Sequence, residues 1–424
     1  MKFLTKVFSL FVILAFFFSC SGKSTKGTKI RVSYWGDSKE IEIIDSIVKP
    51  WDEAHPEISV VLEHIPANQY VDKVLTMIAG GQAPDIIFCE VNNFVNFYVK
   101  DVFLPLDDFI NSDTSFSIKD FYPEIVQRFT RDGKLYIIPR DIAPFACVFY
   151  NKDLFDLEGV PYPKDNWNTE DLIRIAKKLT KKDQKTGLIS QYGFYGWAWW
   201  NWLYAFGGGY VDNFSNPTKI ILDSKTSREG LKFYHDLMHV YEVSPRPGAT
   251  DQSGADLFMT GRLAMYSSGI WESPMFRTIT AFDWDVVMFP KGPTGKRGFG
   301  SGGSGYGISK TSKHPKEAWE VIKCLTDDAG QIKMAEAGLA QPAKISLARS
   351  EHFSGHPGKP LNKKMLDEAV RYICYDPFDP NWPEINRMAI SPNLDLYFRD
   401  EKSLDETLQK IRDDMERLKL AIGK

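Results

Sequence analysis

Short apolar runs alternate with amphipathic segments along the early part of the chain. Residues 29–34 and 58–65 are rich in β-branched and aromatic side chains, which predicts two strands. Residues 40–51 and 69–79 place apolar side chains at helical spacing, which predicts two helices. Residues 84–91 are almost all apolar, as in a strand that both faces of a sheet bury. This β-α-β-α-β order predicts a parallel sheet with right-handed crossovers.

The middle of the chain predicts a second α/β region. Residues 135–150 contain two extended stretches that Pro139 and Pro144 interrupt, and a segment of this length could run from one lobe into another. Apolar positions at helical spacing then predict helices over residues 168–182 and 228–243.

The last third is predicted to return to a strand and then to helices. Residues 298–309 (GFGSGGSGYGIS) begin as a glycine-rich stretch and are predicted to continue as a strand, and Pro315 then begins a helix. Ser403 and Glu406 form a capping box at the start of a long amphipathic helix that ends the chain.

An apolar segment follows the first lysines of the sequence. Lys2 and Lys6 precede an apolar run over residues 7–18, which is too short and too early for a spanning helix and is typical of a signal peptide. Ser19 directly before Cys20 resembles a bacterial lipobox, although phenylalanines occupy the two positions before Ser19. We therefore expect lipid on Cys20; the alternative is a simple cleaved signal peptide with a chance cysteine. The polar stretch that follows predicts a flexible tether and an exported protein.

Composition narrows the class of protein. The 424 residues exceed the length over which one hydrophobic core keeps growing, so we expect two domains. The net charge of −3 and the lack of a long basic run argue against nucleic acid as a partner. Aromatic residues reach 14%, which is enough to fill the cores and leave a minority for a ligand pocket.

The sequence contains few candidates for catalytic residues, metal ligands or disulfides. Ser301 and Ser304 lack the G-x-S-x-G context of a nucleophile, so no catalytic residue is expected. His235 and His239 stand four apart on a predicted helix and could share a metal, but no third ligand is evident in the sequence, so a solvated helix face is favoured and no metal is expected. The remaining cysteines form no CxxC pair; buried free thiols are favoured, and a disulfide stays open. These cysteines are Cys89, Cys147, Cys324 and Cys374.

Four stretches of the chain resemble a known family in content and order. They are IRVSYWGD, YVDKVLTMIAGGQAPDII, the region with YNKDLF and a Pro-x-x-x-Trp-x-x-Glu/Asp pattern, and LFMTGRLAMYSSGIW followed by GGSGYGISKTSKHPKEAWEVI. With these motifs the chain resembles the extracellular solute-binding proteins of ABC sugar importers, a group that includes maltose- and glycerol-3-phosphate-binding proteins. The resemblance covers nearly all of the chain after the tether.

The resemblance implies an α/β fold of two lobes, each with a mainly parallel sheet flanked by helices, and a ligand cleft between them. It also implies a monomer that closes on a carbohydrate and delivers it to permease subunits in the membrane, with no cofactor. The expected division is residues 1–19 as signal peptide, 20–27 as lipid-anchored tether, 28–142 plus 295–330 as the N-terminal lobe, and 143–294 plus 331–424 as the C-terminal lobe.

Candidate ligand contacts in the N-terminal lobe lie at the carboxyl ends of strands, where open α/β sheets bind ligands. Trp35 and Asp37 follow the first predicted strand, and Glu90 ends the third. Tyr70 opens the second predicted helix and could stack on or donate to a ligand. Asp141 lies at the crossing between lobes, where the family commonly contacts ligand. Core packing and local pairing, including an Arg140–Asp141 pair, are the structural alternatives.

Further candidates come from the C-terminal lobe and the glycine-rich stretch. The segment GWAWWNW places four tryptophans within six residues, and we expect one or two of them, Trp199 and Trp200, to stack on a sugar while others face the core. Gly208 could let backbone approach a ligand, the family has an aromatic contact where Trp271 stands, and Gly303 could shape a loop at the cleft.

The sequence is compatible with three alternatives to sugar import. The ligand could be a glycerol phosphate or another polar molecule. Alternatively, a membrane sensor could recognise the closed, ligand-bound form of the protein. The chain could also be a periplasmic carbohydrate-active enzyme that uses Glu90 and Asp141, which would require a separation of about 5–9.5 Å between the carboxyl groups.

Overall fold

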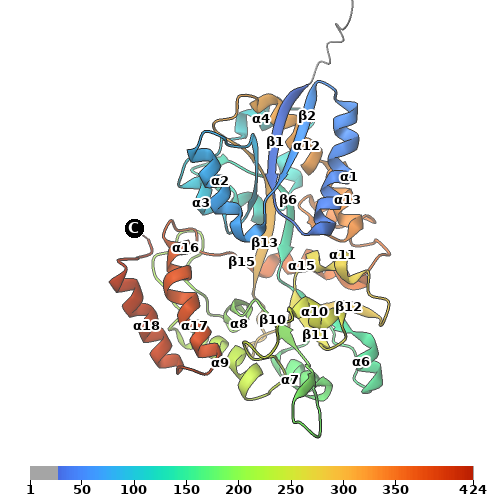
Figure 1. Cartoon of the computed structure of the whole chain (residues 1–424), viewed down its shortest axis with the longest axis vertical. Helices are drawn as coiled ribbons and strands as arrows, with labels where there is room; N and C mark the ends of the chain where they lie inside the picture. Colours follow the sequence, from blue (N-terminus) through green and yellow to red (C-terminus); the bar gives the residue numbers. More distant parts are fainter. Residues whose placement is uncertain (1–26, 424) are drawn as a thin grey trace, which may run out of the picture.

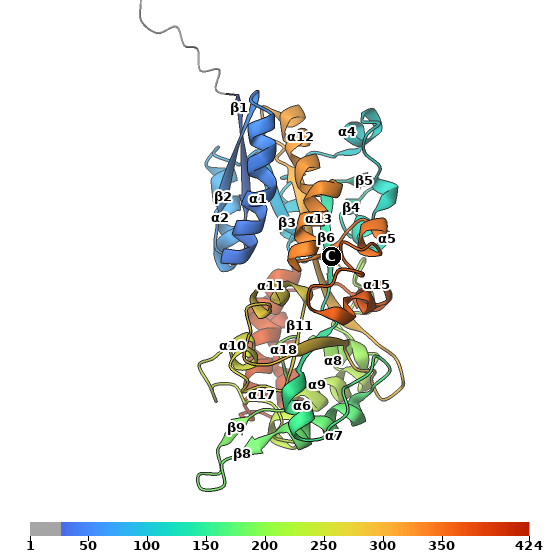
Figure 2. The same cartoon turned by 90° about the vertical axis from the view of Figure 1, so that its right-hand side faces the viewer.

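The computed structural model describes residues 27–423, so the expected signal peptide and Cys20 lie outside the described residues. Two hydrophobic cores divide the described chain into two stacked lobes, which Figure 1 shows above and below a waist and Figure 2 shows from the side. We call them the N-terminal and the C-terminal lobe.

The N-terminal lobe is built on a seven-stranded sheet with the order β14-β6-β13-β3-β1-β2, and β15 pairs with β13. Its strands are β1 (Thr28–Tyr34), β2 (Ile58–His64), β3 (Ile86–Glu90), β6 (Ile138–Pro144), β13 (Phe299–Ile308), β14 (Gln341–Pro342) and β15 (Ile373–Cys374), beside the hairpin of β4 (Thr130–Arg131) and β5 (Lys134–Leu135). Its helices are α1 (Ser38–Ala54), α2 (Tyr70–Ala79), α3 (Phe94–Tyr98), α4 (Asp107–Ser112), α5 (Pro123–Arg128), α12 (Pro315–Thr326), α13 (Asp328–Ala337) and α14 (Ile345–Ala348), with 3₁₀ turns at Ala67–Gln69 and Ile118–Asp120.

The C-terminal lobe has a four-stranded sheet with the order β10-β11-β7-β12. Its strands are β7 (Cys147–Asn151), β10 (Tyr195–Gly196), β11 (Met265–Ser268) and β12 (Trp284–Met288), beside a separate hairpin of β8 (Lys181–Lys182) and β9 (Ile189–Gln191). Its helices are α6 (Lys152–Leu157), α7 (Thr169–Leu179), α8 (Trp200–Ala205), α9 (Lys225–His239), α10 (Gly254–Met259), α11 (Ser273–Phe276), α15 (Met365–Ala369), α16 (Trp382–Ile385), α17 (Ser391–Phe398) and α18 (Leu404–Arg417), with short helical turns at Ile270–Glu272, Leu361–Lys364, Val370–Tyr372 and Asn386–Ile390.

The β1-α1-β2-α2-β3 order follows the predicted pattern, and β1 pairs with β2 and β3 in parallel. The expectation of a mainly parallel sheet fails beyond this unit. β13 is antiparallel to β3 and β6, and in the other lobe β7 is antiparallel to both β11 and β12. These strands pair across long sequence separations, which local periodicity does not reveal.

Helix α18 begins as its capping box predicts. The Ser403 hydroxyl accepts from the Glu406 N–H at 3.3 Å, and the Glu406 carboxylate accepts from the Ser403 N–H at 2.9 Å. The two bonds satisfy backbone donors that the first helical turn leaves without partners.

The chain crosses between the lobes in several places. β6 belongs to the sheet of the N-terminal lobe and β7, three residues later, to the sheet of the C-terminal lobe. β13 crosses back, since Phe299 lies in the C-terminal core and Tyr306 in the N-terminal core. Several crossings between two lobes are typical of a hinge.

β13 is a buried strand along its whole length, whereas the sequence favoured a loop that only turns into a strand. A Cβ at position 305 would lie 2.1 Å from the carbonyl oxygen of Ile138, so glycine is needed for β6 to approach. Gly303 has φ +130° beside a register shift between Ser304 and Gly305, a bulge that bends the strand where it reaches the waist.

The segment after α12 lies in the N-terminal lobe, although the expected division placed residues 331–424 in the C-terminal lobe. α13 packs on α1, and β14 pairs with β6, with Gln341 opposite Ile142. Met334 and Leu339 belong to the N-terminal core. Helix α13 has no clear apolar stripe, so the local sequence does not indicate which sheet the segment covers.

The four cysteines of the described chain are free, as the sequence analysis favoured. Three of them, Cys89, Cys147 and Cys324, are buried, and Cys374 is half-buried. Within residues 27–423 no helix is both long and apolar enough to cross a membrane.

Candidate ligand-binding cleft

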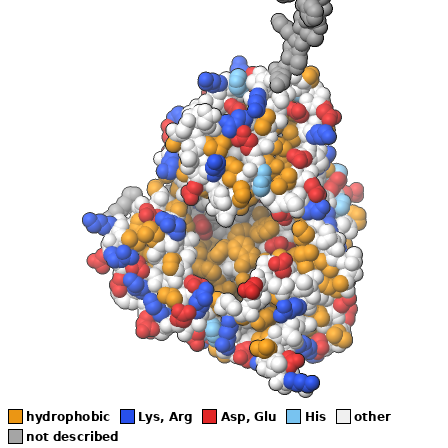
Figure 3. Space-filling view, in the orientation of Figure 1, with side chains coloured by type: hydrophobic (Ala, Val, Ile, Leu, Met, Phe, Trp, Pro, Cys, Tyr) orange, Lys and Arg blue, Asp and Glu red, His pale blue; other side chains and the backbone are white. Residues whose placement is uncertain are grey.

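The waist between the lobes is hollowed, and hydrophobic side chains form much of the floor visible in Figure 3. A cavity of about 520 Å³ lies here, within the range of small-molecule sites. It is lined by Trp35, Gly36, Asp37, Glu40, Ala67, Phe88, Glu90, Arg140, Asp141, Ala143, Phe145, Trp271, Gly302, Gly303, Ser304, Leu339 and Ala340. Six of the ten candidate contacts are therefore brought together: Trp35, Asp37, Glu90, Asp141, Trp271 and Gly303.

The N-terminal lobe presents its residues at the carboxyl ends of β1 and β3. Trp35 directly follows β1 and is half-buried, with its ring edge-on to Tyr70 and Phe88 at centroid distances of 4.7 Å. Asp37 caps α1, because its Oδ1 accepts from the backbone N–H groups of Lys39 and Glu40. Trp35 is thus held by the core on one side while it lines the cavity on the other.

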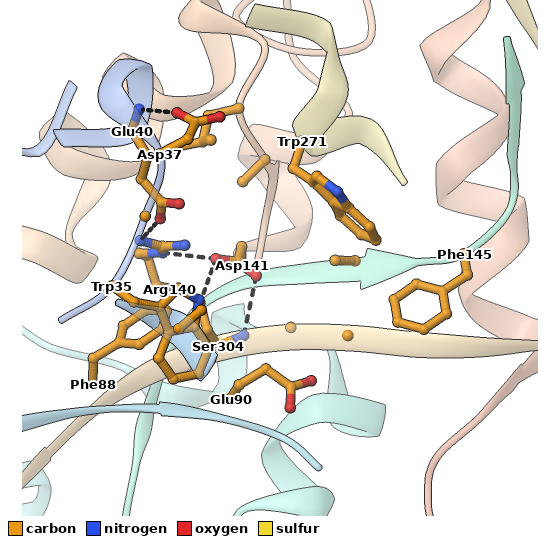
Figure 4. Close-up of a pocket in the computed structure, with 17 residues that line it drawn as sticks. Trp35, Asp37, Glu40, Phe88, Glu90, Arg140, Asp141, Phe145, Trp271 and Ser304 are labelled. Atoms are coloured by element: carbon orange, nitrogen blue, oxygen red, sulfur yellow. Dashed lines mark hydrogen bonds and ion pairs between the residues drawn. The ribbon is translucent and has the colours of Figure 1, made fainter. Parts of the chain in front are cut away.

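A charged network spans the crossing strands at the cavity wall (Figure 4). Asp141 accepts from Arg140 Nε at 2.7 Å, from the Ser304 hydroxyl at 2.7 Å and from the Ser304 N–H at 3.0 Å. Arg140 Nη1 also donates to Glu40 at 2.9 Å. Burial opposes the charge of Arg140, but Asp141 and Glu40 raise its pKa well above the ordinary value. The network joins α1, β6 and β13, and the Arg140–Asp141 pair expected as the structural alternative is present.

Glu90 ends β3 and lines the cavity with a carboxyl group that Asn92 orients. The Asn92 backbone N–H donates to Oε2 at 2.8 Å, and its side-chain amide donates to Oε1 at 3.1 Å. Burial raises the pKa of Glu90 to about 8, against the lowering effect of the Asn92 N–H. Near neutral pH the carboxyl is therefore mostly protonated, and it can both donate to and accept from a ligand.

Aromatic rings from the C-terminal lobe face this wall. Phe145 follows β6 and meets the ring of Trp271 edge-on, with centroids 5.4 Å apart. Trp197 lies 5.4 Å from Phe145 and donates from Nε1 to the Ser268 hydroxyl at 3.2 Å. The ring of Trp271 folds back over the backbone, since a Cβ at Gly269 would lie 1.8 Å from it.

A second cavity of about 250 Å³ adjoins the first, because both are lined by Glu90 and Phe145. Trp200 is in its wall, pressed against β13, where a Cβ at Gly300 would lie 2.4 Å from the indole Nε1. Asp376 also lines it, and burial raises the pKa of that carboxyl. Together the two cavities have the volume and the aromatic side chains to hold a ligand larger than a single sugar ring.

Three candidate contacts do not line these two cavities. Tyr70 is fully buried, and its hydroxyl donates to the carbonyl oxygen of Phe88 at 2.9 Å, so it supports the site from within the core. Trp199 lines a separate cavity of about 440 Å³ in the C-terminal lobe. Gly208 lies against α9, where a Cβ would meet the Ser227 backbone nitrogen at 2.6 Å, so the glycine serves packing. Trp202 is 1% exposed and fills the core, as expected for part of the tryptophan cluster.

Several lining residues were not singled out as contacts. Phe145 stands between two strands in an apolar stretch, and only its position at the crossing could have distinguished it. Glu40 looked like an ordinary residue of the first helical turn. Asp376 comes from the far end of the chain, and no local signal placed it here.

The fold and the cleft define a two-lobed α/β binding protein. The chain belongs to the bacterial extracellular solute-binding proteins, since the model of that family matches residues 35–332. A putative binding protein of Brucella abortus is 24% identical over 370 residues, which are 83% of this chain and 84% of that protein. An arabinooligosaccharide-binding protein of Halalkalibacterium halodurans is 23% identical over 317 residues, 72% of this chain and 68% of that protein.

Solved structures share the fold. An ABC substrate-binding protein of Listeria monocytogenes, solved in complex with cycloalternan, superimposes with a TM-score of 0.82. It is 24% identical, and the match covers 93% of this chain and 99% of the other. The two-lobed architecture expected from the resemblance is thereby confirmed.

Proposed function

We propose that this solute-binding protein captures a neutral oligosaccharide between its lobes and delivers it to the permease of an ABC importer. The observation that carries the proposal is the character of the cleft. Aromatic rings from both lobes line it, and Arg140, the one cation among the residues lining the larger cavity, is already held by Glu40 and Asp141. Rings stack on the C–H faces of sugars, and free carboxyl oxygens serve hydroxyl groups.

The proposed contacts are divided between the lobes. Trp35 and Glu90 would engage the ligand from the N-terminal lobe, and Trp271 would cover it from the other side. Trp200 would extend the site into the adjoining cavity. Similar proteins bind an arabinooligosaccharide and cycloalternan, and these carbohydrate ligands support the choice of class.

A phosphorylated ligand fits the cleft less well. A phosphate is normally bound by an Arg or Lys fork or by a free helix N-terminus. Arg140 donates from Nε to Asp141 and from Nη1 to Glu40, so two carboxylates already pair with its charge, and the start of α1 is capped by Asp37. An anion at this wall would therefore compete with two carboxylates for the one cation.

Binding is also favoured over hydrolysis. A glycosidase needs a carboxylate that is free to attack or to activate water. Both oxygens of Asp141 accept bonds from Arg140 or Ser304, so its lone pairs serve the crossing strands. The Glu90–Asp141 pair considered for hydrolysis is therefore not free to act, and Glu90 would bind hydroxyl groups.

The proposal includes a monomer held at the membrane by lipid on Cys20. Lys2, Lys6 and the apolar run before the cysteine support export, and the family is extracellular. Labelled palmitate should enter the parent chain but not Cys20→Ala; a mature chain that begins well past Cys20 would overturn the anchor.

Calorimetric titration with two matched ligand sets tests the ligand class. We expect neutral di- to tetrasaccharides to include a ligand with a Kd of about 10 µM or tighter, and glycerol phosphodiesters to bind at least roughly 100-fold more weakly. Preference for the phosphorylated set would refute the carbohydrate proposal.

A further inference from the structure

A cluster of metal-ligating side chains lies in the C-terminal lobe, on residues that do not line the two cavities of the cleft. His235 and His239 stand one turn apart near the end of α9, and Asp400 follows the end of α17. One potential ligand atom from each residue lies within 4.8 Å of the others. From this geometry we propose that His235, His239 and Asp400 bind a divalent transition metal such as Zn²⁺, which joins α9 to the end of α17.

The helix supplies the first two ligands in the right arrangement. Residues four apart project from the same face of a helix, one turn above the other. The two imidazole rings are stacked, with centroids 4.3 Å apart and an angle of 22° between their planes. Imidazole nitrogen is a preferred ligand for Zn²⁺, Cu²⁺ and Ni²⁺.

Asp400 supplies the third ligand from a distant part of the sequence. Its Oδ1 lies 3.1 Å from Nε2 of His235, so the carboxylate already points at the histidine pair. The residue has φ +63°, the left-handed conformation that aspartate tolerates better than most residues. Its N–H donates to the Tyr397 carbonyl oxygen at 2.9 Å, which fixes the turn that carries the side chain.

Neighbouring aromatic rings and one backbone carbonyl set the present orientation of the two imidazoles. His235 is stacked between His239 and Tyr397, whose ring centroid is 4.7 Å away. Nε2 of His239 lies 2.9 Å from the carbonyl oxygen of Phe398, a type of contact that commonly orients a metal-bound histidine. The side chain of His235 is 14% exposed, whereas that of Asp400 is 67% exposed and free to adjust.

Metal binding requires the two imidazole rings to leave their stacked arrangement, because a metal ion lies in the plane of each imidazole that coordinates it. Zn²⁺ lies about 2.0–2.2 Å from nitrogen and oxygen ligands, which brings tetrahedral ligand atoms to roughly 3.4 Å from one another. Rotation of the two rings and of the exposed Asp400 side chain would achieve this, and water would fill the fourth position. The metal would fix Phe398, which packs against Trp199 and Tyr234, and would so stabilise the C-terminal lobe.

Zinc titration of the chelator-treated mature chain tests the site. We expect one Zn²⁺ per chain with a Kd below roughly 10 µM. A tenfold excess of free Zn²⁺ over Kd should raise the melting temperature of the C-terminal lobe by about 3 °C. His235→Gln, His239→Gln and Asp400→Asn should each weaken Zn²⁺ binding at least roughly tenfold.

The variants separate metal binding from hydrogen bonding. Asparagine tolerates the left-handed backbone at position 400 and keeps a hydrogen-bonding side chain, so Asp400→Asn should fold and melt like the parent without metal. His352→Asn is the matched control, since His352 pairs with Glu336 elsewhere and its loss should leave Zn²⁺ affinity unchanged. Equal Zn²⁺ affinity in the parent and in the His235→Gln/His239→Gln double variant would overturn the proposal, as would an equal loss in the control.

Discussion

Replacing Trp271 with alanine should weaken binding of the cognate saccharide by roughly 5- to 150-fold. Trp271 lines the larger cavity, and Phe145 and Trp197 support its ring at centroid distances of 5.4 and 6.5 Å. The substitution removes a large apolar face that a sugar would cover, a loss on the order of 1–3 kcal/mol. Calorimetry with the ligand of the parent protein measures the change directly.

Trp51→Ala provides the matched control. Trp51 stacks on His55 in α1, with ring centroids 4.1 Å apart, and is not among the residues lining the cleft cavities. The control should bind within about twofold of the parent. Parent-like affinity in Trp271→Ala would show that the aromatic wall of the proposed site is in the wrong place.

Replacing Asp141 with asparagine should lower the free energy of unfolding by about 3–5 kcal/mol, the usual cost of breaking a buried ion pair from one side. Asp141 is 4% exposed and accepts bonds from Arg140 and Ser304. Asparagine has nearly the same shape but no charge, so Arg140 is left buried with only Glu40 as a charged partner. Urea denaturation, followed by circular dichroism, measures the loss as a lower midpoint at an unchanged slope.

An exposed ion pair gives the comparison for this variant. Glu42 pairs with Lys39 on the surface of α1 at 2.8 Å, and Glu42→Gln should change stability by less than about 1 kcal/mol. If Asp141→Asn were as stable as Glu42→Gln, the network would not hold the crossing strands together.

Local pattern was enough to predict the β1-α1-β2-α2-β3 unit. Its strands are short and apolar, and each helix has one apolar stripe, so periodicity alone distinguishes them. The same unit places Trp35 and Glu90, because the carboxyl ends of neighbouring parallel strands meet at one edge of the sheet. The positions of these two residues in the candidate cleft therefore follow from the sequence with little further information.

Contacts between segments far apart in the sequence explain most of the differences between the predicted and the observed structure. Glycine is rare inside strands, so the sequence did not predict that β13 is one strand along its whole length; the close approach of β6 at Gly305 and of the Trp200 ring at Gly300 explains two of its glycines. Asp376 lines the adjoining cavity from a segment far from β3, and Asp400 meets His235 across 165 positions of the sequence. Contacts of this kind depend on the tertiary fold and have no local periodicity.

The tryptophan cluster illustrates the limit of composition. Four rings within six residues predict a role in binding, but their directions depend on how α8 packs. Trp202 contacts Phe233 and Phe289 in the core, whereas Trp200 lines the adjoining cavity and Trp199 a separate one. The residue type predicted an aromatic site, but only the fold shows which ring lies in the core and which lines a cavity.

The central claim is that a saccharide is captured by closure of the two lobes. The proposed contacts come from both lobes, and only their approach would let all of them engage one ligand. Small-angle scattering with and without the cognate saccharide tests this most directly. The account predicts a monomer whose radius of gyration decreases at saturation; an unchanged scattering profile with bound saccharide would contradict it.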